Sequence, residues 1–232
     1  MIIAGIHGGN EWNTIALADE LIAHLQAHPE LIQSDKTLYI LRSLNPDGEA
    51  RAHGVDGRVN DHGVDINRNF PAFWRQEFEQ LGAGPYPTSE PEVRAMVDFV
   101  IAHPNSGAGI SYHTHSGVIL RPMGTCSDDD MIPEDLWAYQ RFSKLGEQLT
   151  GYPAVSIWHE FKYHPKEVIG GTQDWLYEHL GALFWVVEIW SPNQAAEIKD
   201  YKWIDWFRDH PVEDDLKLLK WSDEQCGGQA HV

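Results

Sequence analysis

The chain alternates short apolar runs with stretches in which apolar residues recur at helical spacing. Short apolar runs between turn signals predict buried strands at residues 1–6, 38–41, 110–112, 118–120 and 182–190. Apolar residues at every third or fourth position predict helices from Thr14, after residue 89, over 133–149 and over 172–180. Strands that alternate with helices are typical of an α/β sandwich with a mostly parallel sheet.

Turn and cap signals mark the borders of these elements. Residues 45–48 (NPDG) predict a turn, and the loop-rich stretch 48–88 is long enough to indicate a functional loop. Residues 89–92 (SEPE) predict a capping box with Pro in the first helical turn. Terminal helices docked by aromatic residues are predicted from Trp203, Trp206, Leu216 and Leu219. Since we find no internal repeat and no linker, we expect a single domain, residues 1–232.

The composition narrows the class of protein. The 232 residues carry a formal net charge of −18, which would repel nucleic acid and anionic membranes. The only cysteines, Cys126 and Cys226, are too few for a disulfide framework or a thiolate metal site. No apolar run reaches the roughly 18 residues of a transmembrane helix, and the first residues lack the basic start of a signal peptide. We therefore expect a cytoplasmic, reduced protein without nucleic-acid or membrane partners.

Two groups of residues suggest a metal site. His7 follows a predicted buried strand, and Glu11 lies four residues on. An imidazole nitrogen and a carboxylate oxygen that face one point suit a divalent metal such as zinc, although the same pair could simply cap a helix. His113 and His115 share one face of a strand. Either could be a third ligand, or both could fill a polar pocket.

Acid–base and anion-binding candidates lie elsewhere in the chain. Glu188 is a single acid within the apolar run FWVVEIW. Burial there would raise its pKa and suit a general base, unless the strand end reaches the surface. Arg58, Asn67 and Arg68 lie in the polar loop region, where arginine and amide groups fit a carboxylate ligand. A solvated loop is the simpler alternative.

Taken in order, the segments that carry these residues resemble the zinc carboxypeptidases of the carboxypeptidase A type. The segments are GIHGGNEW, NPDG, RVN, GVDINRNFP, ISYHTHSGVILRP and GGTQDWLYEHLGALFWVVEIW. The resemblance extends from about residue 1 to residue 190, and its most specific parts are GVD-x-NRN and the 14-residue step from Asp174 to Glu188. It implies a zinc carboxypeptidase/phosphorylase-like fold, a three-layer α/β sandwich with a mixed, mostly parallel, twisted sheet.

The resemblance implies one zinc ion per chain. Its ligands would be His7, Glu11 and His113. Asp65 would orient the first histidine from behind. Glu188 would be the general base that acts on metal-activated water.

The resemblance also implies a substrate site. Arg58 would polarise the scissile carbonyl. Asn67 and Arg68 would hold the terminal carboxylate of the substrate. Thr172 and Gln173 would form the pocket for the substrate side chain.

The first ligand pair departs from the family pattern. The family has His-x-x-Glu, whereas one extra residue separates His7 from Glu11 here, which would swing the acid by roughly 100° within a helix. Gly8 and Gly9 can absorb that residue in a bulge before the helix. Asn10 has the usual spacing, but a neutral amide is a poor zinc ligand. We expect Glu11 to be the ligand.

Two other positions also differ from the family. Lys166 stands where the family has a mobile tyrosine that covers the substrate, and Tyr163 is our candidate for that role. His115 replaces the usual aromatic residue after the ligand, and we expect it to line the pocket.

We expect a zinc metallocarboxypeptidase that hydrolyses the C-terminal bond of a peptide or small amide with a free carboxylate. Gln173 argues against a strongly basic or purely apolar side-chain preference. One alternative is an amidase of the same fold that acts on a murein γ-D-glutamyl–diaminopimelate peptide or an N-acyl amino acid. Another is a binding module that has lost catalysis. Family members have strands before the one that presents His7, so an exposed sheet edge would permit pairing with a second chain.

Overall fold

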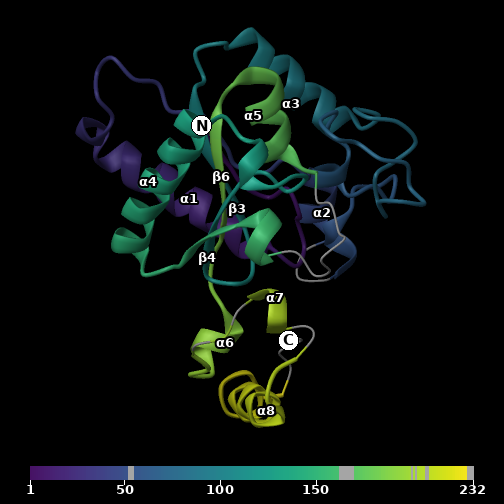
Figure 1. Cartoon of the computed structure of the whole chain (residues 1–232), viewed down its shortest axis with the longest axis vertical. Helices are drawn as coiled ribbons and strands as arrows, with labels where there is room; N and C mark the ends of the chain where they lie inside the picture. The colour runs from purple at the N-terminus through teal and green to yellow at the C-terminus, as the bar shows by residue number, and fades with distance from the viewer. Residues whose placement is uncertain (52–54, 162–169, 200, 202, 207–208, 229–232) are drawn as a thin grey trace.

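The computed structural model describes the chain except residues 52–54, 162–169, 200, 202, 207–208 and 229–232 (Figure 1). In the described residues the centre is a six-stranded sheet in the order β2-β1-β3-β6-β4-β5. Its strands are β1 Ile2–Ile3, β2 Ile40–Leu41, β3 Ala108–His113, β4 Val118–Arg121, β5 Ala154–Ser156 and β6 Leu183–Glu188. β4 runs antiparallel to β6, and the other pairings are parallel. The predicted mixed, mostly parallel sheet is confirmed.

Helices cover both faces of this sheet. They are α1 Trp12–Ala27, α2 Pro46–Ala50, α3 Pro91–Ala102, α4 Pro133–Thr150, α5 Thr172–Leu180, α6 Pro192–Ala195, α7 Trp203–Trp206 and α8 Val212–Cys226. Short 3-10 turns are η1 Pro29–Leu31, η2 Val55–Arg58, η3 Ile66–Arg68 and η4 Asp128–Asp130, and η5 Ile157–Phe161 is a π-helical turn. In Figure 1, α1 and α4 lie on one side of the sheet and α3 and α5 on the other. None of the helices in the described part of the chain is long and apolar enough to cross a membrane.

Alternation along β6 explains the layers. Phe184 belongs to a buried cluster with side chains of α3 and α5. Trp185, the next residue, packs against Tyr139 of α4 with ring centroids 4.8 Å apart. Successive side chains of a strand point to opposite faces, so one short segment serves both layers. Apart from Glu188, the run that predicted this strand is apolar at successive positions because helices pack against both of its faces.

The carboxyl ends of β3 and β6 place two polar side chains next to each other. His113 is the last residue of β3, Glu188 is the last residue of β6, and the two are register partners in the parallel ladder. β1 runs parallel to β3, so the chain reaches His7 beyond the same, carboxyl-terminal ends of the strands. Ligands of open α/β sheets bind at these carboxyl-terminal ends.

Some predicted boundaries were wrong. The strand predicted over residues 1–6 ends at Ile3, and the chain turns at Gly5, whose φ of +60° ends the extended run. The predicted turn after the second strand is the start of α2, because the side chain of Asn45 accepts a hydrogen bond from the Gly48 nitrogen at 2.9 Å. β5 was not predicted, since a strand of three residues has no clear period.

The predicted capping box at Ser89 does not form. α3 begins at Pro91, and Glu90 occupies the N-cap position without a side-chain cap bond. The Ser89 hydroxyl donates instead to the Glu90 carboxylate at 2.6 Å. The same carboxylate accepts from the amide of Asn60 at 2.6 Å, which ties the helix start to the preceding loop.

Three of the apolar residues whose helical spacing predicted α4 are exposed. They are Phe142, Leu145 and Leu149. Together with Tyr112 and Trp185 they line an apolar hollow over the sheet. The helical period was predicted correctly, but α4 covers the sheet face beneath it only in part, and these side chains remain open to solvent.

The C-terminal helices have a small core of their own, and α6, α7 and α8 lie together at one end of the molecule in Figure 1. Trp206 and Leu218 pack in this core. Leu216 and Leu219 are exposed, contrary to the prediction, because α8 turns Leu218 inward in their place. Trp203 belongs instead to a cluster that includes β4 and β6 side chains.

Candidate active site

The turn between β1 and α1 takes up the extra residue of the first ligand pair. α1 begins at Trp12, so Glu11 precedes the helix and does not lie within it. Gly8 packs so closely that an added Cβ would lie 2.2 Å from the carbonyl carbon of Gly48. Glycine is therefore required where the chain bends toward Glu11.

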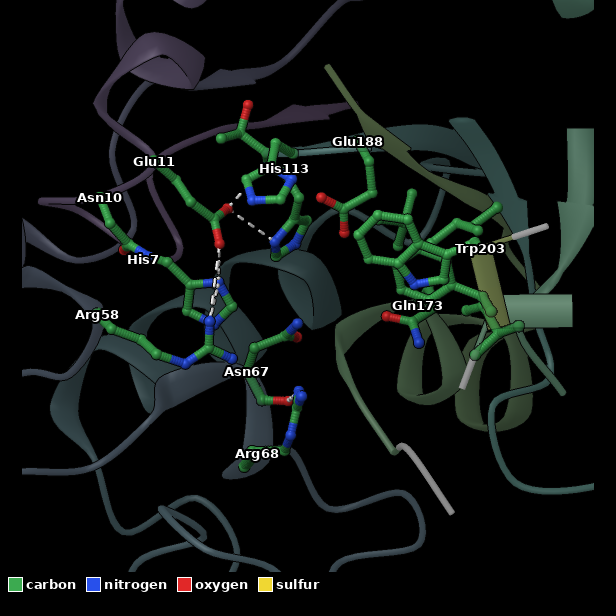
Figure 2. Close-up of a pocket in the computed structure, with 16 residues that line it drawn as sticks. His7, Asn10, Glu11, Arg58, Asn67, Arg68, His113, Gln173, Glu188 and Trp203 are labelled. Atoms are coloured by element: carbon green, nitrogen blue, oxygen red, sulfur yellow. Dashed lines mark hydrogen bonds and ion pairs between the residues drawn. The ribbon is translucent and has the colours of Figure 1, made fainter. Parts of the chain in front are cut away.

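His7, Glu11 and His113 converge on one point (Figure 2). One ligand atom from each lies within 4.8 Å of the other two. Oε1 of Glu11 lies 2.7 Å from Nδ1 of His7, and Oε2 lies 3.1 Å from Nδ1 of His113. All three side chains are buried, whereas Asn10 is exposed. Glu11 rather than Asn10 thus lies between the two histidines.

This donor set fits zinc. Two imidazole nitrogens and one carboxylate are ligands that zinc takes in catalytic sites. Burial lowers the pKa of His113, which favours a neutral ring with a free lone pair. Its Nε2 is buried without a hydrogen-bond partner in the described residues. Its Nδ1 is the nitrogen that faces the carboxylate of Glu11, and a cation bound between the two groups would take the place of the proton they share.

Two carboxylates surround His7. Its Nε2 lies 2.9 Å from Oδ1 of Asp65, and Glu11 lies at its Nδ1. Burial alone would lower the pKa of His7, but the negative charges of Glu11 and Asp65 raise it to about 9. Although burial acts in the opposite direction, the two histidines hold the pKa of Glu11 far below its usual range. This concentration of negative charge favours a bound cation.

Arg58 and Glu188 flank the ligand group on opposite sides (Figure 2). Nη2 of Arg58 lies 2.8 Å from Oδ2 of Asp65, and Nη1 lies 3.8 Å from Oε1 of Glu11. The guanidinium is partly exposed and lines the cavity. Burial, and then the charge of Glu11, raise the pKa of Glu188 to about 8. A carboxyl group with such a pKa can take and return a proton near neutral pH.

Asn67 is held with its amide nitrogen toward the cavity. Its Oδ1 accepts hydrogen bonds from the backbone nitrogen of Thr172 at 3.0 Å and from the Thr172 hydroxyl at 2.8 Å. Because both bonds end on the oxygen, the NH₂ group is left to face the cavity that Asn67 lines. Arg68 lines the same wall, and we call Asn67 and Arg68 the donor pair. Such a pair suits an anionic group.

Thr172 does not form the pocket that the sequence predicted for it. Its side chain is fully buried and is not part of the cavity wall. Its hydroxyl instead contacts Asn67, which does line the cavity.

Gln173 lines the cavity, and Asp174 holds it from behind. Nε2 of Gln173 donates to Oδ2 of Asp174 at 2.8 Å. Asp174 also accepts from the backbone nitrogens of Gly124 at 2.9 Å and Gly171 at 3.2 Å. Because this bond uses the amide nitrogen of Gln173, its carbonyl oxygen is left as an acceptor for a group in the cavity. Burial raises the pKa of Asp174 to about 7, although the two backbone hydrogen bonds lower it.

The cavity has a volume of about 230 Å³. The apolar part of its wall comprises Leu120, Ile157, Phe161, Val186 and Trp203. His115 also lines it, as expected. Trp203 comes from α7, and no signal in the sequence linked it to the site. Tyr163, the expected cover of the substrate, lies outside the described residues.

The fold and the site define a class of protein, an α/β sandwich with a buried His/Glu/His group at the carboxyl-terminal ends of its parallel strands. The family model described as zinc carboxypeptidase matches residues 1–201, so the chain belongs to the zinc carboxypeptidase family. The resemblance predicted from the motifs is confirmed.

Curated relatives are carboxypeptidases. Carboxypeptidase A1 of Mus musculus is 29% identical over 209 residues, which cover 76% of this chain and 47% of that protein. Carboxypeptidase A1 of Rattus norvegicus is 32% identical over 207 residues, with the same coverage of 76% and 47%. The chain therefore spans about half the length of the curated relatives it matches.

Solved structures share the fold. Carboxypeptidase A from Helicoverpa armigera superposes with a TM-score of 0.63 at 19% identity, over 100% of this chain and 62% of that one. Bovine thrombin-activatable fibrinolysis inhibitor, in complex with tick carboxypeptidase inhibitor, gives a TM-score of 0.65 at 19% identity, over 95% and 80%. At such identities the likeness concerns the fold alone, and it agrees with the predicted α/β sandwich.

Proposed function

We propose that the chain is a zinc metallocarboxypeptidase that removes the C-terminal residue from a peptide, or cleaves a small amide that has a free carboxylate. The observation that carries the proposal is the convergence of His7, Glu11 and His113 within 4.8 Å of one another. Glu188 and the donor pair line the same cavity. Metal ligands, a proton acceptor and an anion-binding wall are the parts that such a reaction needs.

In this proposal His7, Glu11 and His113 hold one zinc ion per chain. Bound zinc acts as a Lewis acid and lowers the pKa of water, which supplies a nucleophile near neutral pH. Glu188 takes the proton from the attacking water and returns it to the leaving amine nitrogen, a task suited to its pKa of about 8. Arg58 donates hydrogen bonds to the oxyanion that develops on the scissile carbonyl.

The donor pair binds the free carboxylate of the substrate. The NH₂ group of Asn67 and the guanidinium of Arg68 can both donate to it. A substrate held there directs its C-terminal side chain toward Gln173, which offers a carbonyl oxygen as acceptor. This acceptor is uncharged and offers no ion pair to a strongly basic side chain, and it is polar, which supports our expectation of a side chain that is not purely apolar either.

Zinc quantitation together with a substrate panel tests the proposal. The purified protein should contain one zinc per chain and hydrolyse N-acylated dipeptides. Glu188→Gln should lower kcat by about 10²- to 10⁴-fold, because the general base is lost. The zinc content should stay unchanged, because Glu188 is not a ligand. A variant that remains fully active would show that Glu188 is not the base.

The same panel separates the alternatives. It should contain murein tripeptide and N-succinylglutamate beside ordinary dipeptides. If the protein hydrolyses murein tripeptide or N-succinylglutamate but no ordinary dipeptide, it is an amidase of the same fold and not a carboxypeptidase. A protein without zinc, and without activity after zinc is added, would instead be a binding module.

Pairing of two chains along the exposed sheet edge is a separate proposal. That edge is β2, whose outer backbone groups have no strand partner in the described residues. Unpaired edges of this kind can add a strand from another chain. Light scattering in solution measures the mass, and a monomer at all concentrations would contradict the proposal.

A further inference from the structure

Trp203 lies beyond residues 1–201, which match the family model, yet it lines the reaction cavity. It stands at the start of α7 and is 8% exposed. Figure 2 shows its indole beside Glu188 and Gln173, on the side of the cavity away from Arg58. The C-terminal part of the chain therefore reaches the wall toward which the donor pair directs a substrate side chain.

Two aromatic contacts hold this indole in place. Phe161 stacks on it with ring centroids 5.1 Å apart and an interplanar angle of 9°. His115 meets it edge-on with centroids 6.1 Å apart and an angle of 74°. Phe161 and Trp203 belong to one buried cluster. A ring packed in this way has few alternative positions and forms a fixed wall.

Trp203 also lines a second cavity, of about 740 Å³. Its walls include Val118, Val155 and Tyr201. Among the described residues, Trp203 alone lines both this cavity and the reaction cavity. Trp203 is thus the shared wall, or partition, between a reaction cavity of about 230 Å³ and this larger one.

We propose that Trp203 sets the depth of the side-chain pocket and so limits the size of the C-terminal residue that is removed. The inference rests on the proposed function, because that function defines which substrate group enters the pocket. Compact side chains end at the indole, whereas large ones overlap with it. Truncation of Trp203 joins the two cavities and lets a large side chain extend into the second.

The test compares N-acylated dipeptides that differ only in a C-terminal alanine, leucine, phenylalanine or tryptophan. Trp203→Ala should raise the ratio of kcat/KM for the tryptophan substrate over the alanine substrate at least about tenfold. A single methylene group that fits or does not fit a pocket already changes the ratio of kcat/KM between two substrates by about 10- to 200-fold. Trp203→Phe keeps a smaller ring in the partition and should give an intermediate ratio.

Trp206→Ala is the matched control. Trp206 lies on the same short helix and is also 8% exposed, but it packs in the C-terminal core and lines neither cavity. This variant should lose stability and leave the substrate ratio unchanged. An unchanged ratio in Trp203→Ala, or an equal shift in Trp206→Ala, would overturn the inference.

Binding of free amino acids separates failure of the inference from failure of the proposed function. If the wild type hydrolyses no dipeptide, the proposed function fails. Calorimetry with free alanine and free tryptophan then still measures the pocket. Trp203→Ala should gain affinity for tryptophan at least tenfold relative to alanine, and equal changes for both would contradict a role in pocket depth.

Discussion

Thr172 donates two hydrogen bonds to one oxygen of Asn67, although the two residues are 105 positions apart in the chain. The pair fixes which end of the Asn67 amide faces the cavity. An unrestrained amide could turn its oxygen toward the substrate carboxylate, and two acceptors would then face each other. Thr172 is therefore a positioning residue for substrate binding in the proposed reaction.

Thr172→Val should weaken the binding of substrates that have a free carboxylate. The change keeps the shape of the side chain and removes the hydroxyl bond to Asn67, which is worth about 1 kcal/mol. KM should rise about fivefold while kcat changes little, because 1.4 kcal/mol corresponds to about tenfold. Steady-state kinetics with N-acylated dipeptides measures both constants.

Thr172→Ser retains the hydroxyl and should behave like the wild type. Dipeptides with a C-terminal amide carry no carboxylate, and their slow turnover should not respond to Thr172→Val. A fall in kcat with unchanged KM would place Thr172 in a different role.

The sequence predicts the ligand group because each member lies at the end of a recognisable element. His7 follows an apolar run, and His113 ends another, so parallel strands bring both to one edge. Glu11 could not be chosen from spacing alone. The structure places it between the histidines because the turn at Gly8 ends before α1 begins.

The walls of the cavity were less predictable. Asp174 received no role, since its bonds to Gly124 and to Gln173 depend on how α5 meets a distant loop. Trp203 looked like an ordinary docking residue, because a helix of four residues carries no period that points toward the cavity. The family resemblance places Thr172 in the pocket, and only the folded backbone shows that its hydroxyl turns toward Asn67. Contacts across such sequence distances leave no local pattern.

Asp65→Asn should weaken zinc binding by about 10- to 100-fold, the usual effect of losing the partner behind a ligand histidine. Asparagine can still accept a hydrogen bond from Nε2 of His7. It lacks the negative charge that makes the other ring nitrogen, Nδ1, a stronger metal ligand. Competition with a chromophoric chelator measures the affinity. Asp61→Asn removes an exposed carboxylate from the same loop and should leave the affinity unchanged. If Asp65→Asn and the wild type bind zinc with equal affinity, Asp65 has no role in supporting the zinc ligands.

Removal of zinc should lower the thermal stability. At a free zinc concentration 100 times its Kd, binding stabilises the folded state by about 2.7 kcal/mol. For a chain of this length each kcal/mol shifts Tm by about 2–4 °C, so chelation should lower Tm by roughly 5–10 °C. Differential scanning calorimetry with and without chelator measures the shift.

His113→Ala removes a proposed ligand and should abolish the dependence of Tm on zinc. His179→Ala is the control, because His179 is exposed on α5 and should retain the full shift. A zinc-dependent shift of normal size in His113→Ala would exclude His113 as a ligand.

Asp174 should make folding less favourable as pH rises toward neutrality. Burial raises its pKa in the folded chain to about 7, whereas an aspartate in an unfolded chain titrates near about 4. The unfolded chain therefore releases this proton first. The raised pKa contributes stability that is fully present below about pH 4 and is lost as pH rises through about 7.

Asp174→Asn removes this titration. Each unit of pKa difference corresponds to about 1.4 kcal/mol, so the wild type should lose about 1.4 kcal/mol of unfolding free energy per pH unit relative to the variant, between about pH 5 and 6.5. Urea unfolding of both proteins across this range measures the difference. Asp98→Asn, at an exposed position of α3, is the control. Its unfolding free energy should differ from that of the wild type by the same amount at every pH in this range. A flat difference for Asp174→Asn as well would mean that the hydrogen bonds from Gly124 and Gly171 keep Asp174 ionised throughout, against the effect of burial.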